Sequence, residues 1–158
     1  PHGWLTVPAR SATDERPCLG RHLQTELKQQ IYPVHRLDFE VSGVVIFAKT
    51  AAAHKLAQPW FEQGHIRKIY QALSLPLGDL PPNGVQEWRS RLAKGKKRAF
   101  AAPHGKEAVT RAELTKRDEK FWYWQLEPLT GRSHQLRFEM ASRHTPIYGD
   151  VLYGGVPW

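Results

Sequence analysis

The sequence predicts an α+β fold built as one domain. Candidate helices and strands follow one another irregularly, which does not fit the regular strand–helix repeat of a parallel α/β protein. A length of 158 residues is that of one ordinary domain, and we expect residues 1–158 to form it. Hydrophobic residues make up 41% and charged residues 24%, a balance typical of globular chains.

The first part of the chain predicts two helices around one buried strand. Residues 20–30 carry leucines at helical spacing and predict a short amphipathic helix that is stopped by Pro33. Residues 43–48, GVVIFA, are typical of a buried strand. The next stretch, AAAHKLAQPWFEQG, favours a helix that Pro59 kinks or ends, because proline supplies no amide hydrogen.

The middle of the chain predicts a strand over residues 66–75. Its period of two places Lys68 and Tyr70 on one face and Ile69 and Leu73 on the other, so Tyr70 is expected to face away from the apolar set. The next stretch, LGDLPPNG, is typical of a loop because it is rich in proline and glycine.

The last third of the chain predicts a hairpin followed by a helix. Residues 107–117 and 121–129 form two strand candidates. The second would place Trp122, Trp124 and Leu126 on one face, which we expect to lie in the core rather than to stack on RNA bases. After the turn TGR, Ser133 can cap a helix that begins HQLRFEMASR.

The chain is basic, with 23 Lys and Arg against 15 Asp and Glu, which fits either solubility or a polyanionic partner. Residues 89–106 hold seven of the basic residues and no acidic one, and either a solvated loop or a nucleic-acid contact explains them. Cys18 is the one cysteine, and the sequence shows no zinc-site spacing, membrane span or signal peptide. We therefore expect a soluble, cytoplasmic protein without metal or cofactor. Pro1 cannot start translation, so we expect the natural N-terminus to lie upstream or to have been removed.

Three short stretches carry the candidate chemistry: HRLD with Asp38, RKIYQA with Tyr70, and GRSHQLR with Arg132 and Arg137. Each has a structural explanation when taken alone, since an acid beside an arginine is commonly an ion pair and a strand tyrosine commonly packs. Together, in this order and spacing, they resemble the RluA family of pseudouridine synthases. HRLDFEVSG resembles the family's catalytic motif, IRKIYQA its Lys-x-Tyr-x-Ala strand, and GRSHQLRFEMA with PIYGDVLYG its closing motif.

The resemblance implies an activity, a fold and a set of roles. The family isomerises uridine to pseudouridine in RNA without a cofactor, on a mixed, mostly antiparallel sheet with flanking helices and a central active-site cleft. It implies that Asp38 is the catalytic carboxylate, which can attack and later leave, and that Arg137 holds it ionised. Tyr70 would position the uracil, and Arg36 would fill the space left by the flipped-out base. Whether Asp38 attacks C1′ or C6, or removes a ribose proton, stays open.

The expected partner is a stem-loop of ribosomal or transfer RNA, and the sequence indicates no membrane, obligate protein partner or oligomeric state. Basic residues from several motifs are expected to contact this RNA, namely His35, Arg36, Lys68, Lys96, Lys97, Arg98, Arg132 and His134. The chain departs from the family pattern at Val41, Ser133 and Glu139, the last of which stands where histidine is common. We also expect the chain to lack the first strand and the C-terminal end of the family's domain.

Two kinds of alternative remain at this point. A basic RNA-binding module of the same fold would have lost the reaction, although pure binding gains nothing from a carboxylate facing phosphates. A glycoside hydrolase would use Asp38 and Glu40 as its pair, at roughly 6–7 Å along a strand, but nothing else in the sequence indicates a sugar cleft. A metallohydrolase lacks ligand spacing.

Overall fold

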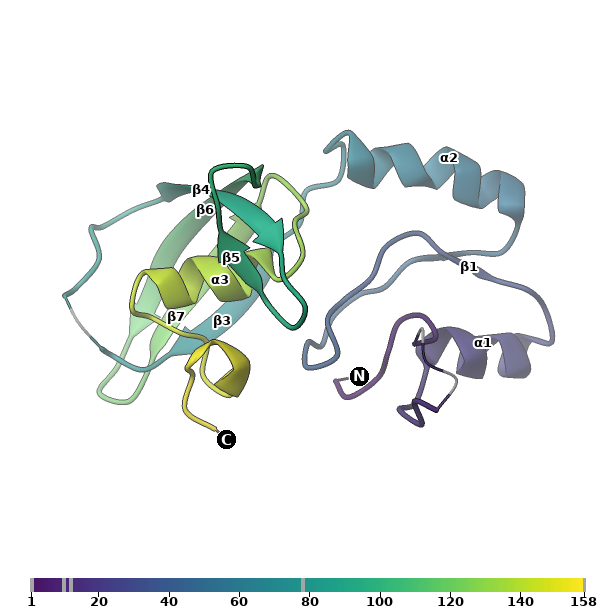
Figure 1. Cartoon of the computed structure of the whole chain (residues 1–158), viewed down its shortest axis with the longest axis horizontal. Coiled ribbons are helices and arrows are strands. Elements are labelled where there is room, and N and C mark those ends of the chain that lie inside the picture. The colour runs from purple at the N-terminus through teal and green to yellow at the C-terminus, as the bar shows by residue number, and fades with distance from the viewer. Residues whose placement is uncertain (1, 10, 12, 78, 158) are drawn as a thin grey trace. The chain divides into compact units, whose positions relative to one another are not determined.

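A computed structural model of the chain describes residues 2–9, 11, 13–77 and 79–157. Contacts divide the chain into two compact units, Pro1–Ile66 and Arg67–Trp158, and each is described by itself. Figure 1 labels most of their helices and strands. Among the described residues, no helix combines the length and the apolar character that crossing a membrane requires.

The first unit contains two helices and a short antiparallel strand pair. The elements run α1 (Leu19–Leu27), β1 (Tyr32–Pro33), β2 (Phe47–Ala48) and α2 (Ala51–Glu62). Helix α1 confirms the helix expected over residues 20–30, although Lys28 in the left-handed conformation ends it well before Pro33. Val34, Ala48 and Ala57 form the small core of this unit, with Tyr32 and Phe61 packed against them.

The buried strand expected over residues 43–48 is wrong in length and burial. Only Phe47 and Ala48 are in β2, and Val44 is 81% exposed. The ladder extends by one bond, from Val34 N to Ile46 O at 3.0 Å. It then stops, because the next amide, Ile46 N, donates to Nε2 of His35 at 3.1 Å instead of to a backbone carbonyl.

Helix α2 continues past its proline. The hydroxyl of Thr50 caps its start by accepting from Ala53 N at 3.1 Å, and the helix runs through Pro59 to Glu62. Of the two outcomes expected at Pro59, a kink or an end, the end is therefore excluded. A missing amide hydrogen removes one bond, and the helix closes with Gln63 N donating to the carbonyl of Pro59 at 2.8 Å.

The second unit is a five-stranded antiparallel sheet with one helix on its face. The strands are β3 (Tyr70–Ser74), β4 (Gln86–Lys94), β5 (Ala99–Ala101), β6 (Lys106–Arg117) and β7 (Trp122–Pro128), in the order β3-β7-β6-β4-β5. Helix α3 (Gln135–Ser142) lies across this sheet, and the 3₁₀ helix η1 (Val151–Tyr153) follows near the C-terminus (Figure 1). The predicted α+β class with a mostly antiparallel sheet is confirmed.

The core of the second unit lies between α3 and the sheet. Strand β7 alternates as predicted, so Trp122, Trp124 and Leu126 are buried on one face, with Met140 of α3 packed on them. The predicted hairpin of β6 and β7 is confirmed. Tyr70 and Ala72 pack against this cluster, so the strand face that carries Tyr70 meets the core, whereas Ile69 on the predicted apolar face is 48% exposed.

Two further expectations are corrected in this unit. The basic residues 89–106 are not a loop, because β4 and β5 pair there as a hairpin. Ser133 does not cap α3, whose first turn begins at Gln135 after a left-handed His134 that makes no capping side-chain bond.

Candidate active site and nucleic-acid interface

Asp38 lies in the segment that joins β1 to β2, and the backbone around it is tied down. The buried hydroxyl of Thr6 accepts from Leu37 N at 3.1 Å and donates to Leu37 O at 3.4 Å. On the other side, Val41 N donates to Asp38 O at 3.1 Å and closes a turn. Asp38 is half-buried. The two anchors therefore fix the carboxylate's attachment point without burying it completely.

The two basic residues before Asp38 have different surroundings. His35 is half-buried, its ring stacks on Phe61 with centroids 4.5 Å apart, and its Nε2 holds the amide of Ile46. This placement gives His35 a structural role in the first unit, and its contact with RNA stays a prediction. Arg36 is exposed, as a side chain that enters RNA must be.

Tyr70 begins β3 and pairs with Leu126 of β7, which fixes its backbone at the edge of the sheet. Lys68 lies two residues earlier, with its ammonium 3.5 Å from the carbonyl of Thr130. Partial burial lowers the pKa of Lys68 below its ordinary value. The contact of Lys68 with RNA stays a prediction.

Arg137 is buried in α3 and held by a carboxylate that the sequence analysis missed. Its Nε donates to Oδ2 of Asp150 at 2.7 Å and its Nη2 to Oδ1 at 2.6 Å, a bidentate pair. The side chains are 9% and 7% exposed. Planar two-point contacts of this kind fix the direction of the guanidinium as well as its charge. The one sequence signal for Asp150 is its place after a glycine in PIYGD.

The loop before α3 is pinned to β6 by Gln135, a second residue that the sequence analysis missed. Its amide oxygen accepts from Thr130 Oγ1 at 2.8 Å and from Arg132 N at 3.0 Å. Its amide nitrogen donates to Val109 O at 3.0 Å and to Thr110 Oγ1 at 2.9 Å. Each of its polar atoms thus has two partners while the side chain is buried.

The other two predicted ligands of this loop also have local partners. Arg132 donates from Nε to the carbonyl of Glu107 at 2.7 Å, which directs its guanidinium along β6. His134 has its Nδ1 3.1 Å from the hydroxyl of Tyr153. Both side chains are half-buried, so each keeps surface that RNA can reach.

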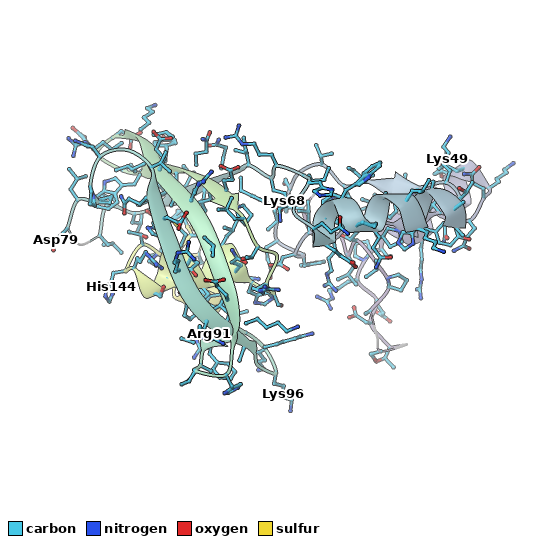
Figure 2. The ribbon with its side chains drawn as sticks, turned by 90° about the horizontal axis from the view of Figure 1, so that it is seen from above. Lys49, Lys68, Asp79, Arg91, Lys96 and His144 are labelled. Atoms are coloured by element: carbon cyan, nitrogen blue, oxygen red, sulfur yellow. The ribbon has the colours of Figure 1, made fainter. Side chains whose placement is uncertain are left out.

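Cations at the turn between β4 and β5 differ from Arg89 on the sheet in whether carboxylates balance their charge. Lys96, Lys97 and Arg98, hereafter the tip cations, are exposed and form no ion pair within the part of the chain that the structure describes. Figure 2 shows Lys96 at the end of this hairpin. Arg89, further down β4, instead pairs with Glu87 at 2.6 Å and with Glu107 at 2.9 Å. Uncompensated positive charge is thus concentrated at the tip.

Glu139, the departure from the family pattern, does not face Arg137. It is fully buried, and its Oε2 pairs with Nη1 of Arg143 one turn later at 2.5 Å. Arg143 in turn lies 4.5 Å over the ring of Trp88. The Oε1 atom of Glu139 has no hydrogen-bond partner among the described residues. The negative charge of Glu139 is therefore balanced within the core of the second unit.

Comparison with known proteins identifies the chain's relatives. A family model described as RNA pseudouridylate synthase matches residues 1–142. The chain belongs to the RNA pseudouridylate synthase family. A dual-specificity RNA pseudouridine synthase RluA of Vibrio cholerae is 32% identical over 97% of this chain and 62% of its own length. A tRNA pseudouridine synthase C of Salmonella typhimurium is 32% identical over 98% of this chain and 64% of its own length.

Solved structures of the pseudouridylate synthase family support the same fold. Human RNA pseudouridylate synthase domain containing 1 matches with a TM-score of 0.76 and 24% identity over 88% of this chain and 61% of its own length. The resemblance to the RluA family is thus confirmed, as is the predicted fold. The chain spans 62% and 64% of the length of the two bacterial relatives.

The family assignment favours the pseudouridine synthase hypothesis over the glycoside hydrolase and the metallohydrolase. The described residues contain no group of three or more His, Cys, Asp or Glu arranged to hold a metal ion. Asp38 belongs to the first unit and Arg137 to the second, so their pairing stays a prediction. Within the second unit, the structure connects Arg137, His134 and β5 through Tyr153.

Proposed function

We propose that the chain carries the catalytic domain of an RNA pseudouridine synthase that acts on a stem-loop of ribosomal or transfer RNA. The proposal is carried by the family match over residues 1–142, which includes Asp38, Tyr70 and Arg137. The names of the bacterial relatives refer to RNA and tRNA, which supports this substrate class.

The reaction is an isomerisation. The bond between uracil N1 and ribose C1′ breaks, the base turns, and a new bond joins C5 to the same C1′. C5 loses a proton and N1 gains one, so no oxidant, reductant or second substrate is consumed. The catalyst must therefore hold a detached base, supply a nucleophile or base, and move one proton.

In the proposed mechanism Asp38 supplies the carboxylate. A carboxylate suits covalent catalysis because it can attack carbon and later leave, and it needs to be ionised to do so. Arg137 provides a fixed positive charge, since Asp150 holds its Nε and Nη2 in one plane. We propose that this fixed cation keeps the catalytic acid ionised and directs it.

Tyr70 is proposed to position the base, because an ordinary phenol with a pKa near 10 is a weak base at neutral pH. Its attachment to the edge of the sheet supports a fixed ring position. Arg36, which is exposed, is proposed to occupy the space that the flipped nucleotide leaves. Removing a base from its stack costs a few kcal/mol, and a planar cation that stacks in its place offsets part of that cost.

RNA binding is proposed to rest on the remaining basic residues. The tip cations have exposed ammonium and guanidinium groups that no described carboxylate neutralises, and phosphates reward clustered charge of this kind. Lys68, Arg132 and His134 gather around the loop before α3, since Lys68 approaches Thr130 and the other two belong to that loop.

The test is to map pseudouridine in the RNA of cells that lack the gene, and again after adding back the wild-type gene or Asp38→Asn. Asparagine keeps the shape of aspartate but is no nucleophile. We expect one or more sites to vanish on deletion, to return with the wild type and to stay absent with Asp38→Asn. Restoration by Asp38→Asn contradicts the role of Asp38, and unchanged pseudouridine after deletion indicates the non-catalytic RNA-binding module instead.

A further inference from the structure

The segment after α3 encloses Arg137 from two directions. Asp150 precedes η1 and holds the edge of the guanidinium, at 2.7 Å from Nε and 2.6 Å from Nη2. Tyr153 ends η1, and Cζ of Arg137 lies over its ring at 5.3 Å from the ring centroid. Tyr153 N also donates to Asp150 O at 3.1 Å, so the two residues form one turn. The two hydrogen bonds and the contact with the ring together leave the guanidinium little freedom to move.

The hydroxyl of Tyr153 leads away from Arg137 to the basic hairpin. It accepts from Ala99 N at 2.7 Å, in a buried hydrogen bond between residues 54 positions apart. Ala99 is the first residue of β5 and directly follows the tip cations. Strand β5 is the edge of the sheet, with β4 as its one neighbour in the strand order. The tyrosine hydroxyl thus accepts a hydrogen bond from an amide at the open edge of the sheet, where the carbonyl of a further strand could otherwise pair.

His134 also contacts this hydroxyl. Its Nδ1 is 3.1 Å from Tyr153 Oη, and the two rings meet edge to face at 5.7 Å. The same hydroxyl also donates to the carbonyl of Ala99 at 3.5 Å, so it contacts both the amide and the carbonyl of the first residue of β5 as well as the imidazole of His134. The hydroxyl therefore has defined partners on both the hairpin and the loop before α3, which fixes the plane of the ring beneath Arg137.

We propose that Tyr153 is a positioning residue that couples the β4–β5 hairpin to Arg137. When phosphates hold the tip cations, β5 and the amide of Ala99 are held with them. The hydroxyl bond then keeps the ring of Tyr153 against the guanidinium, so that binding at the tip sets the orientation of the proposed catalytic cation. The kinetic part of this inference rests on the proposed function, whereas the structural coupling does not.

The first test measures the coupling without RNA or activity. Tyr153→Phe keeps the ring and removes the hydroxyl, and hydrogen exchange is followed by NMR at the amide of Ala99 and at Nε–H of Arg137. We expect both to exchange about tenfold faster in the variant, as expected when a hydrogen bond of ordinary strength is lost. Tyr123→Phe, which removes the hydroxyl that donates to Asp118 at 2.9 Å, is the matched control and leaves both rates unchanged. Faster exchange at Ala99 with an unchanged rate at Arg137 overturns the proposal.

The second test is a kinetic double-mutant cycle on unmodified transfer and ribosomal RNA transcripts carrying tritium at uracil C5. Tyr153→Phe is expected to lower kcat about tenfold with little change in KM, as befits a residue that orients a catalytic group. Replacing the tip cations by glutamine is expected to raise KM and to lower kcat about threefold. In the combined variant kcat should equal that of Tyr153→Phe alone, because the connection is already cut.

If the kcat losses of Tyr153→Phe and of the tip variant multiply in the combined variant, the coupling is contradicted. An unchanged kcat in Tyr153→Phe also contradicts it. Absence of tritium release from the wild type on RNA that it binds contradicts the proposed function instead. The exchange measurement still decides the coupling in that case, so the two ideas fail separately.

Discussion

The buried pair of Arg137 and Asp150 allows a quantitative prediction for Asp150→Ala. Both partners are charged, joined by two short bonds, and less than a tenth exposed. Removing one member of such a pair costs about 3–5 kcal/mol, since the other charge stays buried. The ring of Tyr153 remains beneath the guanidinium and offsets part of that loss, so we expect about 3 kcal/mol. For a chain of 158 residues this corresponds to a Tm lower by about 6–12 °C.

The assay is urea unfolding followed by tryptophan fluorescence, because Trp88, Trp122 and Trp124 lie in the core of the second unit and report on it. The matched control is Glu127→Ala, which removes a carboxylate of β7 that pairs with Arg67 at 3.0 Å. Arg67 is 68% exposed, so this surface pair should contribute less than about 1 kcal/mol. If Asp150→Ala unfolds no more easily than Glu127→Ala, the pair does not hold Arg137 in place as argued.

Three further predictions follow from charge. Replacing the tip cations by glutamine should weaken RNA binding and reduce the slope of log K against log salt by up to about 2–3. The control Arg89→Gln should change this slope less, because Arg89 already pairs with two glutamates. Equal slopes in the two variants contradict the tip contact. Folding lowers the pKa of Lys68, so the unfolded chain binds more protons than the folded chain just below pH 10.5, and the free energy of unfolding rises with pH there. Urea titrations of Lys68→Met should no longer show this rise. If the rise persists in the variant, Lys68 is not its cause. The pKa of Asp118 is lowered, first by the amide of Phe121 and next by the Tyr123 hydroxyl, so its stabilising effect is present above the ordinary value of 3.8 and lost as pH falls below it. Asp118→Ala should therefore unfold more easily at pH 7 and show a flatter acid limb, and wild-type behaviour in both would contradict this.

Local patterns predicted the elements that depend on neighbouring residues. The alternation of Trp122, Trp124 and Leu126 gave β7 its buried face, because a strand repeats every two residues whatever lies across from it. The same alternation was present around Trp88 and Leu92 in β4, both of which are buried. There, the density of Lys and Arg suggested a loop, although charged side chains fit the exposed face of a strand equally well.

The misses depend on contacts between distant residues. His35 ends the β1–β2 ladder through a side-chain bond to Ile46, eleven positions away, which no periodicity encodes. Asp150 meets Arg137 across the rest of α3 and the turn that follows it, and Tyr153 meets Ala99 from 54 positions away. Contacts of this kind depend on the path that the chain takes through the folded domain and not on the residues next to each partner in sequence. The motifs identified the family and Arg137, while the residues that hold Arg137 required the three-dimensional structure.

The most direct measurement of the central claim is tritium release from RNA labelled at uracil C5, using the purified chain and Asp38→Asn side by side. Joining C5 to C1′ expels this hydrogen, so release counts the reaction itself. We expect the wild type to release tritium, and Asp38→Asn to be slower by about 10³-fold or more while it binds the same RNA with similar affinity. Equal release by the two proteins, or none from the wild type on RNA that it binds, would contradict the account.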